Sequence, residues 1–185
     1  KPAALFFMTD ITDRRVAEES LRLSEEKFSK AFQASPDAIV IARLDDGGII
    51  DVNEGFSRLS GYTRTEALNN STVGLGLWDD PMDRDVVVGM LKEKNCVRDI
   101  ISRFRTKDGH VKIGLYSGEI IDLGDEPHTL SVVRDITELF ESQQELIRSE
   151  QKYRAVLESS PDPIVVYDSD GRVVYVNPAF VTVFG

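Results

Sequence analysis

The sequence contains a single cysteine, Cys96, among its 185 residues. One cysteine excludes an intramolecular disulfide, so covalent cross-links cannot stabilise the fold. A lone free thiol suits the reducing environment of the cytoplasm, and we therefore expect this segment to be cytoplasmic. This expectation leaves open a membrane anchor elsewhere in the parent protein.

Long hydrophobic runs are also missing. The longest uninterrupted apolar stretch runs from Ala3 to Met8, whereas a helix that spans a bilayer needs about 20 apolar residues. We therefore expect no membrane contact by this segment.

Positive charge is scarce, because 22 Lys and Arg residues face 32 Asp and Glu residues, giving a net charge of −10. Binding to the phosphate backbone of a nucleic acid needs clustered Lys and Arg. The sequence has no basic stripe, and we expect no nucleic-acid partner.

Sequence motifs for catalysis are missing as well. There is no Gly-rich phosphate loop, zinc-protease helix or nucleophile and base set. The two histidines, His110 and His128, both lie beside predicted turns of a sheet, and neither has the helical, acid-flanked setting of a phosphoacceptor. The acidic residues between 79 and 85 have the spacing of helix capping, without the glycine and glutamate of a calcium loop. We expect this segment to have no metal site and no enzyme activity of its own.

An internal repeat is the strongest positive feature. Three short motifs return 125 residues later, as in Ser35-Pro36-Asp37 and Ser160-Pro161-Asp162. Further matches such as Asn53 and Asn177 are 124 residues apart, which places a one-residue gap in a turn. One structural unit of about 100 residues is therefore present in serial copies. We expect residues 1–10 to be the last strand of a preceding copy and residues 11–35 to be a linker helix. Residues 36–136 are then a complete domain, residues 137–160 a signalling linker helix, and residues 161–185 the first part of a following copy.

Two segments, residues 13–34 and 138–159, lack Pro and Gly and have the apolar periodicity of helices. In the second helix, apolar residues seven positions apart form a short coiled-coil seam, but the complementary positions Gln143 and Glu150 are polar. A weak seam of this kind can have two registers. We expect a homodimer through the linker helices, with a seam of Leu139, Leu146, Tyr153 and Leu157.

The region between these helices has the pattern of a sheet with helices on one face. Alternating and β-branched residues predict five strands at 37–44, 49–52, 97–106, 111–121 and 128–136. Short helices are predicted at 54–60 and 65–68, with a longer helix at 80–95. The fold class is therefore α+β, with a five-stranded antiparallel sheet.

An ordered set of motifs gives this region a family resemblance. The set comprises Ser35-Pro36-Asp37-Ala38-Ile39, Asp51-Val52-Asn53-Glu54-Gly55-Phe56, Gly61-Tyr62-Thr63, Lys107-Asp108-Gly109 and Arg134-Asp135-Ile136-Thr137. In these motifs the chain resembles a PAS sensor domain, or sensory box, with its C-terminal PAC motif, of the kind found in tandem in bacterial and archaeal signalling proteins. The resemblance implies the strand order 2-1-5-4-3, a pocket between sheet and helices, and flanking helices that pass on a conformational signal.

The resemblance also implies that a small-molecule ligand could occupy the pocket. A packed core leaves the same sequence pattern as a cavity, so ordinary core is the alternative. No histidine lies in residues 80–95, where a haem-binding member presents one, and no Asn-Cys-Arg-Phe motif marks a photoadduct flavin. We therefore expect neither cofactor and leave the ligand unknown. The candidate pocket residues are Asn53, Phe56, Trp78, Val87, Met90, Leu91, Phe104, Leu115 and Val132.

The last predicted strand runs directly into the exit helix, which predicts that movement of the sheet alters this helix. The signal-relay residues are then Arg134, Asp135, Ile136 and Thr137, and local hydrogen bonds of Asp135 and Thr137 are expected to hold the corner. The downstream output domain expected in the same chain is a sensor histidine kinase of a two-component system. The alternatives are a diguanylate cyclase or phosphodiesterase output, or a ligand-free dimerisation and spacer module.

Overall fold

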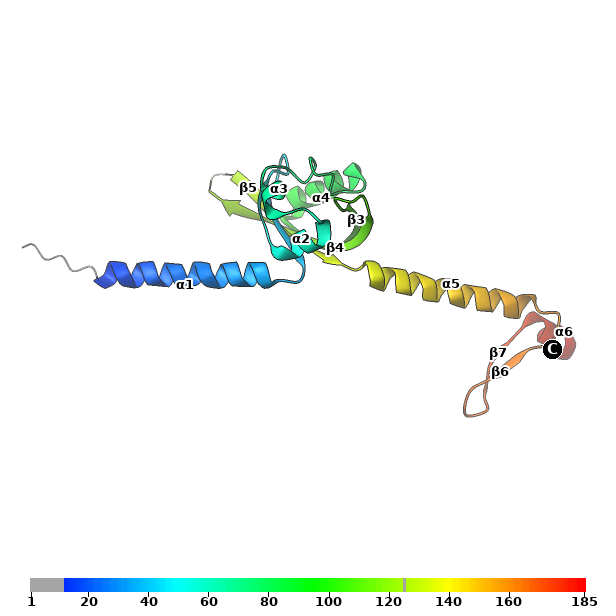
Figure 1. Ribbon diagram of the computed structural model, residues 1–185. Helices are drawn as coiled ribbons and strands as arrows, with labels where there is room; N and C mark the ends of the chain where they lie inside the picture. The colour runs from blue at the N-terminus through cyan, green and yellow to red at the C-terminus, as the bar shows by residue number, and fades with distance from the viewer. Residues whose placement is uncertain (1–11, 125) are drawn as a thin grey trace, which may run out of the picture. The chain divides into compact units, whose positions relative to one another are not determined.

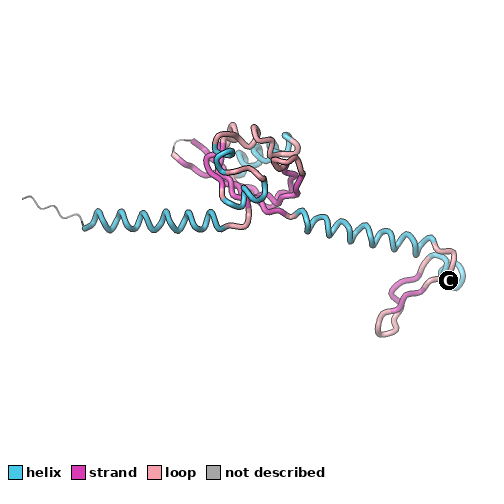
Figure 2. The backbone as a smooth tube through the Cα atoms, viewed as in Figure 1, coloured by secondary structure: helices cyan, strands magenta, loops and turns pink. Residues whose placement is uncertain are grey.

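The computed structural model describes residues 12–124 and 126–185. The chain divides into two compact units after Ile136. Figures 1 and 2 show the helices and strands of each unit. The strand expected in residues 1–10 lies outside the described residues.

The first unit contains a long helix followed by an α+β domain. Its elements are α1 (Thr12–Ala34), β1 (Ala38–Arg43), β2 (Ile49–Val52), α2 (Glu54–Ser60), α3 (Arg64–Leu68), α4 (Pro81–Lys94), β3 (Cys96–Arg105), β4 (Val111–Leu123) and β5 (Glu126–Asp135). The predicted element order is confirmed. The last strand begins two residues earlier than predicted, because Pro127 and Glu126 still pair with the end of β4.

The five strands form one antiparallel sheet in the order β2-β1-β5-β4-β3 (Figure 1). This is the order that the family resemblance implies. The last strand therefore lies in the centre, with Val133 opposite Ala38 of β1 and Tyr116 of β4. The strand that precedes the exit helix is therefore hydrogen-bonded on both of its edges.

Local sequence signals explain the ends of α4. Asp80 is the N-cap and accepts a hydrogen bond from the Met82 amide, Pro81 follows as the first helical residue, and Asn95 ends the helix in the left-handed region with φ of 62°. The preceding segment from Asn69 to Asp80 is loop (Figure 2). These caps fix the position at which α4 covers the sheet.

The core lies between the sheet and the helices α2, α3 and α4. It includes Val52, Phe56, Leu91 and Tyr116, each no more than 4% exposed. Burial of such side chains contributes about 1.5–3 kcal/mol each. This layer of side chains also contains the cavity described below.

The second unit comprises α5 (Thr137–Ser159), β6 (Val165–Tyr167), β7 (Val173–Val176) and α6 (Pro178–Phe184). The two strands form an antiparallel hairpin. This order of helix, hairpin and short helix repeats the order α1, β1, β2, α2 of the first unit. No helix in either described range is long and apolar enough to cross a membrane.

Candidate functional site

A cavity of about 90 Å³ lies between the sheet and the helices α2 and α4. An engineered cavity of about 150 Å³ holds benzene, so this volume has room for a molecule of about four to six non-hydrogen atoms. The walls are mainly apolar, with Ala38 and Val40 from β1 and Leu77 from the loop before α4. The cavity is the first part of the candidate site.

Five of the nine candidate pocket residues line this cavity: Phe56, Trp78, Val87, Leu91 and Phe104. The Trp78 ring lies 5.0 Å from the Phe104 ring and 5.6 Å from the Tyr116 ring, measured between centroids. These three rings form an aromatic wall. Their role in binding a ligand stays a prediction.

Leu115 and Val132 do not line the cavity, because they lie on the opposite face of the sheet. The inner face of β4 instead carries Gly114, Tyr116 and Gly118, all buried. A Cβ atom on Gly114 would lie 2.6 Å from the Phe104 ring, so this position admits no side chain. Glycine within a strand often marks such a close approach, and that signal could have identified the inner face.

Met90 also lies outside the cavity lining. Val87 and Leu91 are one helical turn apart and face the cavity, while Met90 is rotated about 100° from Leu91 around α4. Met90 is half-buried and packs at the edge of the apolar core.

Asn53 is 1% exposed but organises the backbone instead of lining the cavity. Its Oδ1 accepts hydrogen bonds from the amides of Ile39 (2.8 Å) and Phe56 (2.9 Å). Its Nδ2 donates to the carbonyl oxygens of Phe32 and Asp37, both at 3.0 Å. One side chain thus joins the end of α1, the start of β1 and the start of α2.

The second unit contains the same arrangement around Asn177, which is fully buried. Its Oδ1 accepts from the amides of Ile164 (2.8 Å) and Phe180 (3.0 Å). Its Nδ2 donates to the carbonyl oxygens of Leu157 (3.2 Å) and Asp162 (2.9 Å). The repeat in the sequence is therefore also a repeat of hydrogen-bond geometry.

The cavity has polar groups that the sequence analysis did not identify. The hydroxyls of Tyr116 and Ser131 form a buried hydrogen bond of 2.8 Å, and both residues line the cavity. Burial raises the pKa of Tyr116, and the Ser131 hydrogen bond and the Arg84 charge partly offset this rise. Tyr116 therefore remains a neutral hydroxyl at physiological pH.

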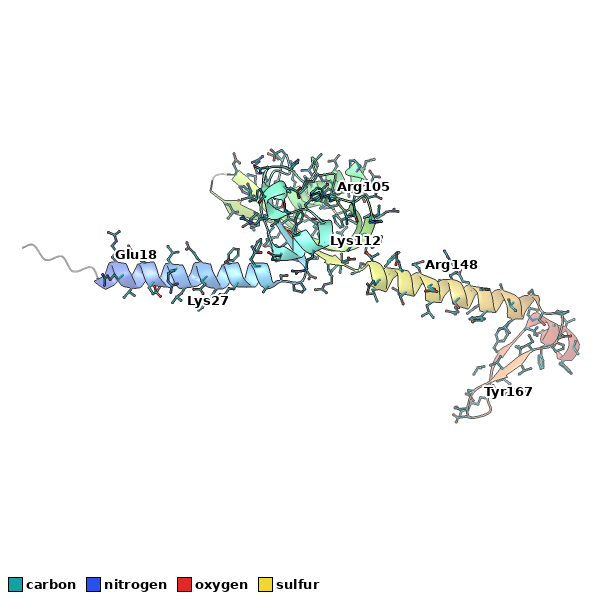
Figure 3. All side chains as sticks on the ribbon, viewed as in Figure 1. Glu18, Lys27, Arg105, Lys112, Arg148 and Tyr167 are labelled. Atoms are coloured by element: carbon teal, nitrogen blue, oxygen red, sulfur yellow. The ribbon has the colours of Figure 1, made fainter. Side chains whose placement is uncertain are left out.

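Four cationic side chains line the cavity: Arg43, Arg84, Arg105 and Lys112, of which Arg105 and Lys112 are labelled in Figure 3. Lys112 Nζ lies 2.8 Å from Asp135 Oδ2. Among the described residues, the carboxylate nearest to Arg84 is that of Asp85, at 3.8 Å. Lys112 thus links the cavity to the last strand, whereas Arg84 does not have a close counter-ion.

The predicted signal-relay residues form a short joint at the end of the sheet. β5 ends at Asp135 and α5 begins at Thr137, so only Ile136 separates strand from helix. The Ile136 amide donates to the Ile113 carbonyl oxygen at 2.9 Å, which extends the pairing of β5 with β4 by one residue. The strand is therefore held to the sheet up to the residue before the helix.

Arg134 connects the same joint to the first motif of the domain. Its Nη2 lies 3.0 Å from Asp37 Oδ2, and its Nε contacts both carboxylate oxygens at 3.2 Å. This pairing raises the already high pKa of the Arg134 guanidinium. The two ends of the domain are thereby joined by a charge-assisted contact.

The predicted dimer seam is exposed on α5. Leu139, Leu146 and Tyr153 are 68–69% exposed, and Leu157 is half-buried. Exposed apolar side chains in one row are available for packing against another helix.

Neither histidine is part of the cavity lining. His128 is buried, and its Nδ1 lies 2.8 Å from the Glu126 carbonyl oxygen. The part of the chain that the structure describes contains no cluster of three potential metal ligands among its His, Cys, Asp and Glu residues.

Comparison with known proteins decides the family. The family model for the PAS domain matches residues 26–95 and again residues 151–185, which together make up more than half of the chain. The chain belongs to the PAS domain family. The α+β domain of the first unit is thus a PAS sensory domain.

Relatives and solved structures agree with this assignment. Sporulation kinase E of Bacillus subtilis is 26% identical over 184 residues, which cover 96% of this chain and 23% of the relative. The chain thus spans about a quarter of that kinase.

Solved structures share the fold. The PAS domain of an HTR-like protein from Haloarcula marismortui has a TM-score of 0.56 at 24% identity, covering 66% of this chain and 99% of its own. A PAS domain from a two-component sensor histidine kinase has a TM-score of 0.55 at 16% identity, covering 62% of this chain and 98% of its own.

Proposed function

We propose that this PAS region senses a small molecule and relays a conformational change through α5 to an output domain. The output is a sensor histidine kinase of a two-component system in the cytoplasm. Residues 161–185 are then the first part of a following PAS copy, and two chains pair through α5 as a homodimer. The similarity to Sporulation kinase E supports the choice of output.

The contact between Lys112 and Asp135 carries this proposal. Lys112 lines the cavity, and Asp135 is the last residue of the central strand before the exit helix. A change in the cavity that moves the lysine ammonium group changes the contacts of the carboxylate. Two packings of the weak α5 seam that differ by a few kcal/mol are sufficient for a switch.

A charge-exchange experiment in the full-length parent protein tests the relay. Lys112→Asp and Asp135→Lys should each change the signal-dependent autophosphorylation, and the double variant should restore it. The exposed pair of Arg98 and Glu119, 2.9 Å apart on β3 and β4, provides the matched control. Exchange of the control pair should leave the output unchanged. A double variant as impaired as the single variants would contradict a role for this contact in the relay.

One observation favours a second candidate function, a ligand-free dimerisation and spacer module. The apolar seam on α5 is exposed, while the cavity is small. Mass spectrometry under native conditions separates the two functions, because a retained small molecule supports sensing.

A further inference from the structure

The Arg84 side chain is largely buried but makes only a long hydrogen bond and a long ion pair. Only 14% of its side chain is exposed, and it lines the cavity. Its Nη2 donates to the Asp45 carbonyl oxygen at 3.3 Å, and its Nη1 lies 3.8 Å from the carboxylate of Asp85. The Asp85 side chain is 81% exposed, so water screens this long contact. A guanidinium group has five N–H donors, and these two contacts leave most of them available.

The other cations of the same region are neutralised at closer range. On the cavity lining, Lys112 is 2.8 Å from Asp135, Arg43 is 2.6 Å from Asp46, and Arg105 is 2.5 Å from Asp79. In a chain of net charge −10, a sheltered guanidinium without a close carboxylate is unusual. Taking a charge out of water costs free energy that a partner must offset. A bound anion would supply that partner.

The Arg84 guanidinium group lies between the cavity, which it lines, and the turn that joins β1 to β2. A Cβ atom on Gly47, whose φ is +71°, would lie 3.2 Å from Arg84 Nη2 and 2.6 Å from Thr72 Oγ1. The glycine thus allows the guanidinium group to lie against the turn between β1 and β2. The Arg84 charge also acts on the Tyr116 hydroxyl. Tyr116 and Arg84 both line the cavity.

We propose that the cavity binds a small monocarboxylate, with its carboxylate on Arg84 and its short apolar tail among Val87, Leu91 and the aromatic wall. Planar carboxylates match the forked donors of arginine. A volume of about 90 Å³ fits a tail of two or three carbons. Arg84 is the one described cation of the lining without a carboxylate within 3.5 Å, and a single unpaired charge beside apolar walls disfavours phosphate and dicarboxylates. This inference rests on the proposed sensing function and names the ligand class of the same site.

The test compares propionate with propionamide, a neutral molecule of nearly the same shape, at constant ionic strength. The sequence has a single tryptophan, and Trp78 lines the cavity, so its fluorescence reports binding to the 185-residue chain. We expect propionate to bind at least 10-fold more tightly than propionamide or inorganic phosphate. Arg84→Met should remove this preference, and Arg84→Lys should keep part of it. Arg98→Met, a cation remote from the cavity, should leave the preference unchanged.

Equal affinity for propionate and propionamide, tighter binding of phosphate, or a preference that survives in Arg84→Met would overturn the inference. The comparison of ligands on the unmodified chain remains decisive if Arg84→Met does not fold. Absence of binding by propionate at tens of millimolar would also overturn the ligand class. The relay would then still be tested separately by the charge exchange at Lys112 and Asp135, which needs no ligand of known identity.

Discussion

Lys112 Nζ lies 2.8 Å from Asp135 Oδ2, which connects a residue of the cavity wall to the last residue of the central strand. Both side chains are about one-third exposed. An ion pair at this exposure contributes less than about 1 kcal/mol to stability. We therefore propose that this ion pair matters for signalling, because it lies directly before α5, and not for stability.

Asp135→Ala should separate stability from signalling. We expect the free energy of unfolding to fall by less than about 1 kcal/mol, while signal-dependent output of the parent protein is lost. Urea denaturation of the chain measures the first quantity, and autophosphorylation of the parent measures the second. Unchanged output would count against the relay.

Asn53→Ala should be among the most damaging single substitutions in the domain. It leaves two buried backbone groups, at Phe32 and Phe56, and two partly buried ones, at Ile39 and Asp37, without their present partner. Each such group costs about 1–3 kcal/mol when left unpaired, so we expect a loss of at least about 3 kcal/mol in urea denaturation.

The control for Asn53 is Asn69→Ala. Asn69 is exposed, and its Nδ2 makes one hydrogen bond, of 2.9 Å, to the Thr65 carbonyl oxygen. Its replacement should cost less than about 0.5 kcal/mol. Similar losses for the two variants would show that the buried asparagine does not organise the domain.

Two glycine substitutions should act in opposite directions. Gly114→Ala places a Cβ atom 2.6 Å from the Phe104 ring and 2.7 Å from Val133, so overpacking should cost about 1–3 kcal/mol. Gly89→Ala on α4 has open space around the new Cβ atom and should stabilise the helix by about 0.5–1 kcal/mol. Thermal denaturation of both variants checks the signs, and a neutral Gly114→Ala would refute the close packing of β4 against β3.

Glu66 should make stability depend on pH below 4.5. A hydrogen bond from Lys107, 2.6 Å away, and bonds from the amide and hydroxyl of Thr63 lower the pKa of Glu66 from 4.5 to about 2. A lowered folded-state pKa stabilises the fold above pH 4.5, and this contribution is lost as the pH falls toward 2.

Glu66→Gln should therefore flatten the dependence of the melting temperature on pH between 4.5 and 2. Lys107→Met removes the strongest of these bonds and should flatten the same range less. If Glu66→Gln leaves the slope unchanged, the ion pair of Glu66 with Lys107 and the hydrogen bonds of Glu66 with Thr63 do not form in solution.

Leu146→Glu should prevent self-association through α5 while leaving the monomer folded. Leu146 is 69% exposed, so its replacement removes no buried contact within the described chain. Gln144→Glu adds the same charge at a neighbouring position outside the seam and serves as control. Analytical ultracentrifugation should show a weaker dimer for Leu146→Glu only. Equal dimerisation of both variants would place the interface elsewhere.

Most of the helices and strands are predictable because the signals that begin and end them are local. Asp80-Pro81 begins α4, and the turn at Lys107-Asp108-Gly109 separates β3 from β4. The strand order came from the family resemblance and not from these local signals.

Predictions for the site were less complete, because they depend on which face of a strand turns inward. Alternation in β4 is equally consistent with Leu115 or Tyr116 facing the helices, and the two glycines beside Tyr116 decide it. Asn53 is predicted to line the pocket, yet its side chain bonds to backbone groups 14 to 21 positions away. The weak pairing of Arg84 depends on distances that no sequence pattern contains.

Amide hydrogen exchange of residues 137–146 in the wild-type chain and in Lys112→Gln tests the relay most directly. Lys112→Gln removes the charge on the cavity wall and leaves α5 itself unaltered. The account predicts at least a three-fold change in exchange rates in these first turns of α5, and no change in the Arg98→Gln control. Identical exchange in wild type and Lys112→Gln would contradict the claim that the cavity wall communicates with the exit helix.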